Sequence, residues 1–423
     1  MKLLIISAIW PSSTHSTRAA NIVIFEMLLA LAKNQKGVQV GLLVVTDGVR
    51  KECIDQESIE DLKKSGVDIL DNILLEPIPR RNISERIFSM PNIADKYPQY
   101  NHRGKIQEAS LKWEADAVLI PWSEWLTHAC SDIPLIKFAY YGNPDPKSAL
   151  AQLALTKKYG KRSLAFLLIQ LLKIKVFEFI HINTMRKYEI LGNVAKNDAN
   201  YYAKKGHPNS FYIQNIWIHP KSKNEVNYEK KRKESPIKII ASIGKLGGTA
   251  NTYGFLYLGK EILPLLEKRL QAINYEVHIL GAGKPQEYVL SALDSSKVIW
   301  RGYVDDIDSE IRNADVFLCV NNATRYKVGH TRYLHAWSLG APVVAHTDAS
   351  LSMPEIRHME TALLGSNALE IVNNIALLLE DENLRRKICN GGEQAYLKYF
   401  QSKSVATIII DKLQLECHKR VKN

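Results

Sequence analysis

Short apolar segments alternate along this chain with longer stretches in which apolar residues recur every three or four positions. Short apolar runs without polar alternation are typical of parallel strands covered on both faces, and the periodic stretches are typical of helices. In the first half, strands are expected at residues 3–9, 38–46, 68–75, 117–120, 135–140, 192–195 and 210–217. A helix expected at about 18–34 joins the first two strands and gives a β-α-β unit.

The same rhythm begins again after a charged segment, residues 221–235, which is poor in large apolar residues and is followed by Pro236. Such a segment is typical of a linker. Beyond it, strands and helices are expected in turn at 237–243, 253–272, 276–280, 284–293, 298–300, 307–313 and 316–320, and residues from 384 to the end are expected to be helical.

This pattern predicts an α/β fold of two doubly wound, Rossmann-like domains that face each other across a cleft. A chain of 423 residues is long enough for two cores of that size. We expect an N-terminal domain at 1–220, a linker at 221–236, a second domain at 237–400, and a C-terminal helix at 401–423 that packs back on the N-terminal domain.

Composition changes this picture little, but the charge adds to it. The formal net charge is +12 and the pI is about 9.2, which favours an acidic partner such as an anionic membrane surface or a phosphate-bearing substrate. Nucleic acid is not expected, because the basic residues are dispersed and form no recognised binding motif. A merely solubilising surface is the other interpretation left open.

The cysteines and the N-terminus indicate a reducing compartment. The five cysteines are far apart and form no Cys-x-x-Cys pair, which argues against a disulfide framework or a zinc site. The apolar run at residues 3–6 is too short for a signal peptide and is predicted to be a strand. No stretch of about 20 apolar residues is present, so a spanning helix is not expected and a cytoplasmic location is.

Residues 161–182 form the most apolar stretch with helical character. Two interpretations stay open. The stretch is either a core or inter-domain helix, or a helix that lies on a membrane surface with Lys161, Arg162, Lys173 and Lys175 toward lipid phosphates.

The strongest candidate for a binding site is the stretch 321–345, in which a polar loop and a short helix lie between two apolar strands. Open parallel sheets bind ligands at the carboxyl ends of their strands, where loop amides and helix N-termini face anions. Lys327, His330, Arg332 and His335 fall at this position. The stretch therefore predicts a site for a nucleotide diphosphate.

Three glycine-containing turns also follow strands, at 243–248, 279–283 and 301–306. Gly244, Gly281, Gly283 and Gly302 allow close backbone approach, and Lys245 adds a positive charge, so a pyrophosphate could be held there. Plain turns are the alternative at each position. Metal binding is not predicted, because no His-Glu-x-x-His or Asp-x-Asp motif is present, and neither is a Ser-His-Asp order.

Together these motifs resemble the donor domain of GT-B glycosyltransferases, specifically the family-4-like group known as glycosyl transferases group 1. The resemblance rests on Gly244-Lys245, on 279–283, on Gly302-Tyr303-Val304, on 338–345, and on the later stretches 353–356 and 362–365. It covers nearly all of residues 237–400 and is looser in the first half.

The sequence departs from the family in three places. The family's paired glutamates fall at Lys327 and His335, where the spacing is kept and both negative charges are lost. His335 can still form a hydrogen bond with a ribose, and Lys327 can pair with a phosphate. The second basic residue of the family's Gly-Arg loop is replaced by Ala250-Asn251-Thr252, and the first loop of the family is replaced around residues 16–20, where Arg18 could face phosphate.

The resemblance implies a retaining glycosyltransferase that uses a nucleotide diphosphate-sugar as donor and needs no cofactor. It implies a glycan acceptor, expected to be lipid-linked, in bacterial surface polysaccharide synthesis, with peripheral association with the cytoplasmic membrane. The residues expected to act in catalysis are Lys327, His330 and Arg332. Those expected to bind the donor are Gly244, Lys245, Gly281, Gly283, Gly302, Tyr303, Val328, Gly329 and His335. Those expected on the acceptor side, in the N-terminal domain, are Trp10, Arg18, Tyr141 and Asn143.

Two alternatives are kept. A nucleotide-sugar epimerase would need carboxylates near strand ends, and Glu124, Asp145 and Glu355 are available. A catalytically silent protein that binds a nucleotide-sugar and partners an active transferase would explain the lost glutamates.

Overall fold

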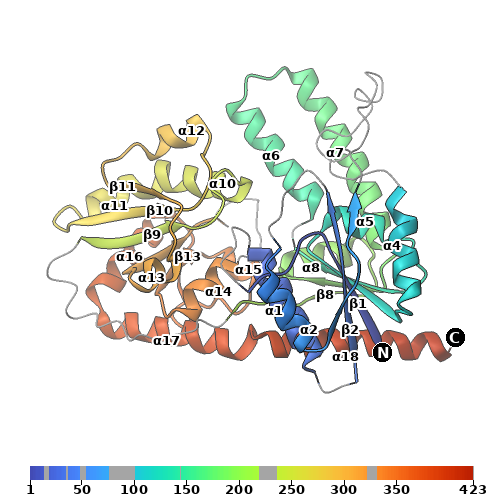
Figure 1. Ribbon diagram of the computed structural model, residues 1–423. Coiled ribbons are helices and arrows are strands. Elements are labelled where there is room, and N and C mark those ends of the chain that lie inside the picture. Colours follow the sequence, from blue (N-terminus) through green and yellow to red (C-terminus); the bar gives the residue numbers. More distant parts are fainter. Residues whose placement is uncertain are drawn as a thin grey trace. The chain divides into compact units, whose positions relative to one another are not determined.

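The computed structural model describes residues 1–13, 19–34, 37–47, 54–75, 101–142, 144–218, 236–321 and 331–422 (Figure 1). The chain divides into two compact units. The N-terminal unit comprises Met1–Ile216 and Ser402–Asn423, and the C-terminal unit comprises Trp217–Gln401.

The N-terminal unit is built on a parallel sheet. Its strands are β1 (Lys2–Ser7), β2 (Gln39–Asp47), β3 (Val67–Ile69), β4 (Ile73–Leu75), β5 (Ala117–Pro121), β6 (Ile136–Tyr141), β7 (Ile190–Asn193) and β8 (Ser210–Tyr212). They lie in the order β3-β2-β1-β5-β6-β7-β8, with β4 also paired to β2. The direction of the order reverses between β1 and β5, so the loops after these two strands border the topological switch point, where open sheets bind ligands.

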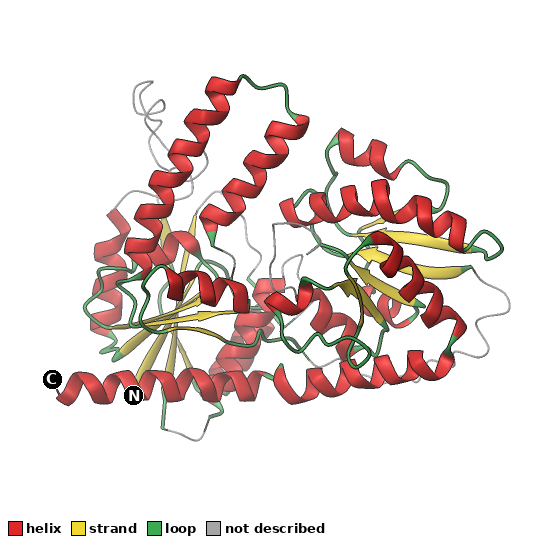
Figure 2. Cartoon of the chain, turned by 180° about the vertical axis from the view of Figure 1, so that it is seen from behind, coloured by secondary structure: helices red, strands yellow, loops and turns green. Residues whose placement is uncertain are grey.

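Helices cover this sheet on both faces, as in Figure 2, where helices are red and strands yellow. They are α1 (Ala19–Ala32), α2 (Gln56–Lys64), α4 (Asn101–Lys112), α5 (Glu124–Ala129), α6 (Asp145–Tyr159), α7 (Leu164–Met185), α8 (Lys196–Lys204) and α18 (Ser402–Lys422). Coverage on both faces explains why Leu3, Leu4, Ile5 and Ile6 of β1 are all fully buried.

The last helix of the chain, α18, belongs to the N-terminal unit. It packs against α1, and Asn34 Nδ2 lies 3.5 Å from Thr407 Oγ1. Val405, Ile409 and Leu413 are fully buried in this contact region. The end of the chain therefore supplies part of the core that is formed around its beginning.

The C-terminal unit contains a second parallel sheet. Its strands are β9 (Ile237–Ser242), β10 (Tyr275–Leu280), β11 (Val298–Gly302), β12 (Val316–Cys319), β13 (Val343–His346) and β14 (Leu363–Gly365). Their order is β11-β10-β9-β12-β13-β14, which places the switch point between β9 and β12. The predicted fold class of two doubly wound, Rossmann-like parallel sheets is confirmed.

The helices of this unit are α10 (Thr249–Tyr257), α11 (Leu263–Arg269), α12 (Glu287–Leu290), α13 (Ile307–Arg312), α14 (Thr331–Ser338), α15 (Ala349–Ser352), α16 (Ala368–Glu380) and α17 (Glu382–Tyr399). A π-helical turn, Leu258–Ile262, separates α10 from α11. The prediction of one helix at 253–272 is wrong in this respect, because periodicity cannot show a change in helical hydrogen bonding.

Three further details differ from the sequence-based prediction. The strand expected at 68–75 is two short strands, β3 and β4, and the strand expected at 210–217 ends at Tyr212. Helices α2, α4, α5, α6, α8, α15 and α16 were not predicted. Helix α5 has six residues, which is too short for a helical period to stand out.

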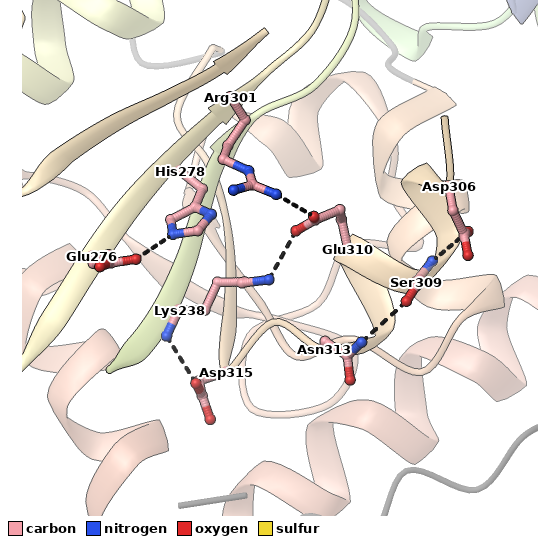
Figure 3. Close-up of polar contacts among 9 residues, drawn as sticks. All are labelled: Lys238, Glu276, His278, Arg301, Asp306, Ser309, Glu310, Asn313 and Asp315. Atoms are coloured by element: carbon pink, nitrogen blue, oxygen red, sulfur yellow. Dashed lines mark hydrogen bonds and ion pairs between the residues drawn. The ribbon is translucent and has the colours of Figure 1, made fainter. Parts of the chain in front are cut away.

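A polar cluster holds α13 against the sheet (Figure 3). The Glu310 carboxylate of α13 accepts from Lys238 Nζ at 2.8 Å and from Arg301 Nη2 at 3.1 Å. Burial raises the pKa of Glu310, but the two cations outweigh burial and the pKa is lowered. Asp306 caps the helix by accepting from Ser309 N at 2.9 Å. Helix α13 is thus fixed beside β9 and β11.

Candidate functional site

The turns after β9, β10 and β11 are joined through their backbones. Gly281 N donates to Gly302 O at 2.7 Å, and Leu246 N donates to Ala282 O at 3.0 Å. Gly281 has a φ of +140°, and a Cβ placed on it would lie 1.7 Å from the carbonyl oxygen of Gly244. The structure therefore brings Gly244, Gly281 and Gly302 together, and position 281 has no room for a side chain.

A network of amide side chains crosses the switch point of the same sheet. Asn251 Nδ2 donates to Lys245 O at 2.7 Å, and Asn321 Nδ2 donates to Asn251 Oδ1 at 2.7 Å. Asn251 lies in α10 and Asn321 directly follows β12, and both are 3% exposed. The network ties the glycine turn after β9 to the carboxyl end of β12.

Arg332 joins this network from the first turn of α14. Its Nη1 donates to Asn251 Oδ1 at 3.0 Å and to Asn321 Oδ1 at 2.8 Å. Both acceptors are neutral amides, and none of the ion pairs among the described residues includes Arg332. The guanidinium is thus held in place by groups that do not cancel its charge, and it can attract an anion.

Lys245 and the start of α10 lie beside this network. The side chain of Lys245 is exposed, and its carbonyl is held by Asn251. Gly248 is the N-cap of α10 and, having no side chain, supplies no capping hydrogen bond to the first N–H groups of the helix. A cation, a free helix N-terminus and a close glycine turn together suit a phosphate group.

His335 is buried, at 6% exposure, and already has protein partners. Its Nε2 lies 2.6 Å from Asp308 Oδ1 of α13, and its ring centroid lies 5.0 Å from that of Trp217. A ribose hydroxyl would therefore have to use Nδ1 or replace Asp308. The predicted ribose contact stays a prediction, with this restriction on its geometry.

Of the other residues predicted to bind the sugar donor, some are exposed and some lie outside the part of the chain that the structure describes. Tyr303 directly follows β11 and is 59% exposed, so its ring is available for stacking on a planar group. Gly283 has a φ of +89° and open space around it. Lys327, Val328, Gly329 and His330 lie outside the described residues.

On the acceptor side, two predicted residues lie outside the described part of the chain, namely Arg18 and Asn143. Trp10 follows β1, and its carbonyl accepts from Asn21 Nδ2 at 2.7 Å. Tyr141 is 1% exposed and packs against His181 and Tyr202, so its ring lies in the core of the N-terminal unit and not on its surface.

Trp122 was not predicted as a site residue, although it directly follows β5 at the switch point of the N-terminal sheet. Its φ is +45°, which is strained for a bulky side chain. Its ring stacks on Tyr140 with a centroid distance of 6.0 Å. Its indole Nε1 is buried and has no hydrogen-bond partner. Strain and an unsatisfied donor at a strand's carboxyl end are typical of binding sites. The sequence did contain a signal for this position, because an apolar strand ends there and is followed by Trp122, Ser123 and Glu124.

Asn251 and Asn321 were likewise not predicted as site residues. Asn251 stands where a second basic residue was expected, and it positions Arg332 in its place. Asn321 is the first polar residue after the strand, which is a signal that the sequence contains. Among the described residues, no group of His, Cys, Asp or Glu side chains could hold a metal ion.

Two doubly wound, Rossmann-like parallel sheets in one chain are the architecture of the GT-B fold. Residues 237–381 match the family described as Glycosyl transferases group 1. The predicted GT-B fold is confirmed, and the predicted resemblance to group 1 glycosyltransferases is confirmed for these matched residues. No curated protein matches the chain.

Solved structures share the fold along the whole chain at low sequence identity. Sucrose-phosphate synthase from Thermosynechococcus elongatus has a TM-score of 0.60 and 15% identity, with 100% of both chains covered. HepE from Anabaena, in complex with UDP and glucose, has a TM-score of 0.60 and 10% identity, with 97% of this chain and 99% of that chain covered. The lipopolysaccharide outer core galactosyltransferase WaaB has a TM-score of 0.58 and 10% identity, with 98% and 100% covered.

Substitution of Gly281 tests the glycine contact. Gly281→Ala should lower the free energy of unfolding by about 3 kcal/mol or more, because a strained φ and a backbone clash add together. Gly283→Ala is the matched control and should lose about 1 kcal/mol, because it meets the strained φ without a clash. Urea unfolding measures both. Equal losses would show that the Gly244 contact relaxes freely.

Trp122→Phe tests the unsatisfied indole. It removes a buried donor that has no partner, so the free energy of unfolding should change by less than about 1 kcal/mol. Trp113→Phe in the same unit removes a donor that lies 3.2 Å from Asp68 Oδ2 and should lose more, about 1.5–3 kcal/mol. A larger loss for Trp122→Phe in urea unfolding would contradict the assignment of an unpaired N–H.

Proposed function

We propose that the protein transfers a sugar from a nucleotide diphosphate-sugar to a glycan acceptor. The observation that carries the proposal is the Arg332 guanidinium, which two neutral amides hold at the switch point of the C-terminal sheet. Lys245 and the uncapped N-terminus of α10 lie on the other side of the same network. These groups suit a diphosphate.

The chemistry follows from where negative charge develops. As the glycosidic bond to the donor breaks, charge grows on the leaving diphosphate, and fixed cations lower the barrier by stabilising it. We assign this role to Arg332 and Lys245, which would make a metal ion unnecessary. Lys327 and His330 stay proposed as groups that neutralise or protonate the leaving phosphate. Retention of the anomeric configuration is proposed from the family.

A uridine diphosphate-sugar is the first donor to test. HepE, which shares the fold, was solved with UDP and glucose. The exposed ring of Tyr303 is proposed to stack on the base. Gly302 fixes the backbone beside that ring through its bond to Gly281.

For the acceptor we propose a lipid-linked glycan in bacterial surface polysaccharide synthesis, with the reaction on the cytoplasmic side of the membrane. The fold shared with a lipopolysaccharide galactosyltransferase and the net charge of +12 support this choice. Trp10 and Trp122 border the switch point of the N-terminal sheet. We propose that this edge of the N-terminal sheet faces the acceptor.

The test is a thermal-shift panel of UDP, GDP, ADP and CMP and their sugar conjugates, with and without EDTA. A ligand at 100 times its Kd adds about 2.7 kcal/mol of stability, which is easily detected. The bound conjugate is then incubated with lipid-linked acceptors. Binding with transfer supports the proposal. Isomerisation of the sugar without acceptor would indicate an epimerase instead, and binding without turnover would indicate a silent binding protein.

Arg332→Gln should weaken binding of the diphosphate about 10- to 100-fold, because a charge-assisted contact contributes about 1.5–3 kcal/mol. Arg357→Gln is the control, since Arg357 is exposed and pairs with Glu360 on the surface of the same unit. Isothermal titration with UDP measures both variants. Equal affinity for wild type and Arg332→Gln would remove Arg332 from the site.

His335→Ala separates the ribose contact from the phosphate contact. Loss of a ribose hydrogen bond should weaken UDP binding about 3- to 10-fold and leave inorganic pyrophosphate binding unchanged. The variant should also be less stable, because the contact between His335 and Asp308 is lost. If UDP and pyrophosphate weaken by the same factor, His335 acts only by supporting α13 and α14.

A further inference from the structure

Helix α7 exposes an unusual amount of apolar surface. Its exposed large apolar residues, with their exposed fractions, are Leu164 (70%), Phe166 (37%), Leu168 (57%), Ile169 (53%), Leu171 (40%), Leu172 (67%), Val176 (45%), Phe179 (69%) and Ile180 (47%). Monomeric soluble proteins rarely leave so much contiguous apolar surface in water, and such patches mark interaction sites.

These residues gather on one side of the helix. At 100° per residue, Leu164, Leu168, Leu172, Val176 and Phe179 follow the spacing of one helical face. We call this surface, together with Ile169 and Ile180, the α7 face. Its seven side chains span about four turns of helix.

The α7 face is not needed to hold the helix in the fold. The opposite side of α7 buries Ile174, Phe177 and Met185 at 0–7% exposure. It packs on α5 and α6, and His181 Nε2 lies 2.7 Å from the Tyr202 hydroxyl. Figures 1 and 2 show α6 and α7 as a pair of long helices that extends beyond the sheet. The helix is therefore anchored by one side and apolar on the other.

The surroundings of the α7 face are basic. Residues 157–178 contain six cations, Lys157, Lys158, Lys161, Arg162, Lys173 and Lys175, and a single carboxylate, Glu178. Lys175 and Lys173 fall near the two edges of the face by helical spacing. Lysines in such positions extend their charged ends to water or phosphate while their stems cover apolar surface.

The single carboxylate is already neutralised. Glu178 accepts from Tyr201 at 2.7 Å and pairs with Lys175 at 3.0 Å and Lys205 at 3.1 Å. Burial raises the pKa of Glu178, but these three contacts outweigh burial and lower it to about 2. An anionic surface that approaches α7 therefore meets a net positive charge, because the six cations of residues 157–178 outnumber this one carboxylate.

From this geometry we propose that the α7 face docks on an anionic lipid surface, with its apolar side chains in the acyl boundary and the six cations at the phosphates. A helix with one apolar side and cations beside it lies parallel to the membrane, at the boundary between lipid headgroups and acyl chains. Among the described residues, no helix is long and apolar enough to cross a bilayer, which agrees with docking and not with spanning. A second copy of the chain fits less well, because a two-fold contact would bring both sets of cations together.

The inference goes beyond the proposed transfer reaction, because none of the donor-site residues described above lies on α6 or α7. It supplies a reason for the net positive charge that the donor site does not. It also places the N-terminal unit at the surface where a lipid-linked acceptor would be found. Membrane docking and sugar transfer can fail independently, so they are tested separately.

The first experiment is flotation of the full chain with vesicles of phosphatidylcholine, with and without phosphatidylglycerol. The wild type should float with anionic vesicles and be released by high salt. Leu168→Gln/Leu172→Gln should weaken partitioning about tenfold or more, because two exposed leucines lose their apolar transfer energy. Leu415→Gln on α18 is the matched control, at 52% exposure, and should change partitioning less than about twofold.

The second experiment distinguishes insertion from other occupants. Phe179→Trp should give a blue-shifted emission that brominated lipids quench, relative to the wild-type background. Sedimentation velocity without lipid should show a monomer. Absence of flotation overturns the proposal, and so does a dimer that Leu168→Gln/Leu172→Gln dissociates, which would assign the face to a second copy. Flotation that is equal in wild type and this double variant would place the lipid contact elsewhere.

Discussion

The arrangement of the candidate site depends on one constraint, which is that the positive charge of Arg332 is held by oxygens that carry no charge. Asn251 and Asn321 accept from one nitrogen of the guanidinium and also bind each other. A carboxylate in either position would fix Arg332 equally well but would cancel its charge. Neutral acceptors keep the cation both ordered and available, which is what a site for a diphosphate requires.

The glycine turns complete this constraint from the other strands. The backbones of Gly244 and Gly281 lie close together, and backbone hydrogen bonds join the turns after β9, β10 and β11. The amides of α10 then begin directly beside Lys245. Under the proposed function, the replacement of the two expected glutamates at positions 327 and 335 would affect the sugar and ribose end of the site, because neither position belongs to the glycine turns or to the described residues of the Arg332 network.

The two units divide the chemistry of the chain between them. The C-terminal unit carries the ordered cation at its switch point, while the N-terminal unit carries a strained tryptophan at the corresponding point and an apolar helical face surrounded by cations. Net positive charge alone left a membrane, a phosphate-bearing substrate and solubility as explanations. The exposed apolar side of α7 is the observation that favours a lipid surface as the partner of the cations around this helix.

Much of the fold followed from the sequence alone, because buried parallel strands produce uninterrupted apolar runs and glycines are required wherever backbones meet closely. The glycine turns could be named for this second reason. Lys245 and Arg332 could be named because they are cations that follow predicted strands, where open parallel sheets bind anions. The sequence could not decide which polar side chains meet across the switch point, since Asn251 lies far along the chain from Asn321 and Arg332 and meets them only through strand order. Nor could it decide which side of α7 is buried, because both sides are apolar and periodicity then carries no direction. These contacts depend on tertiary packing, and only the structure determined them.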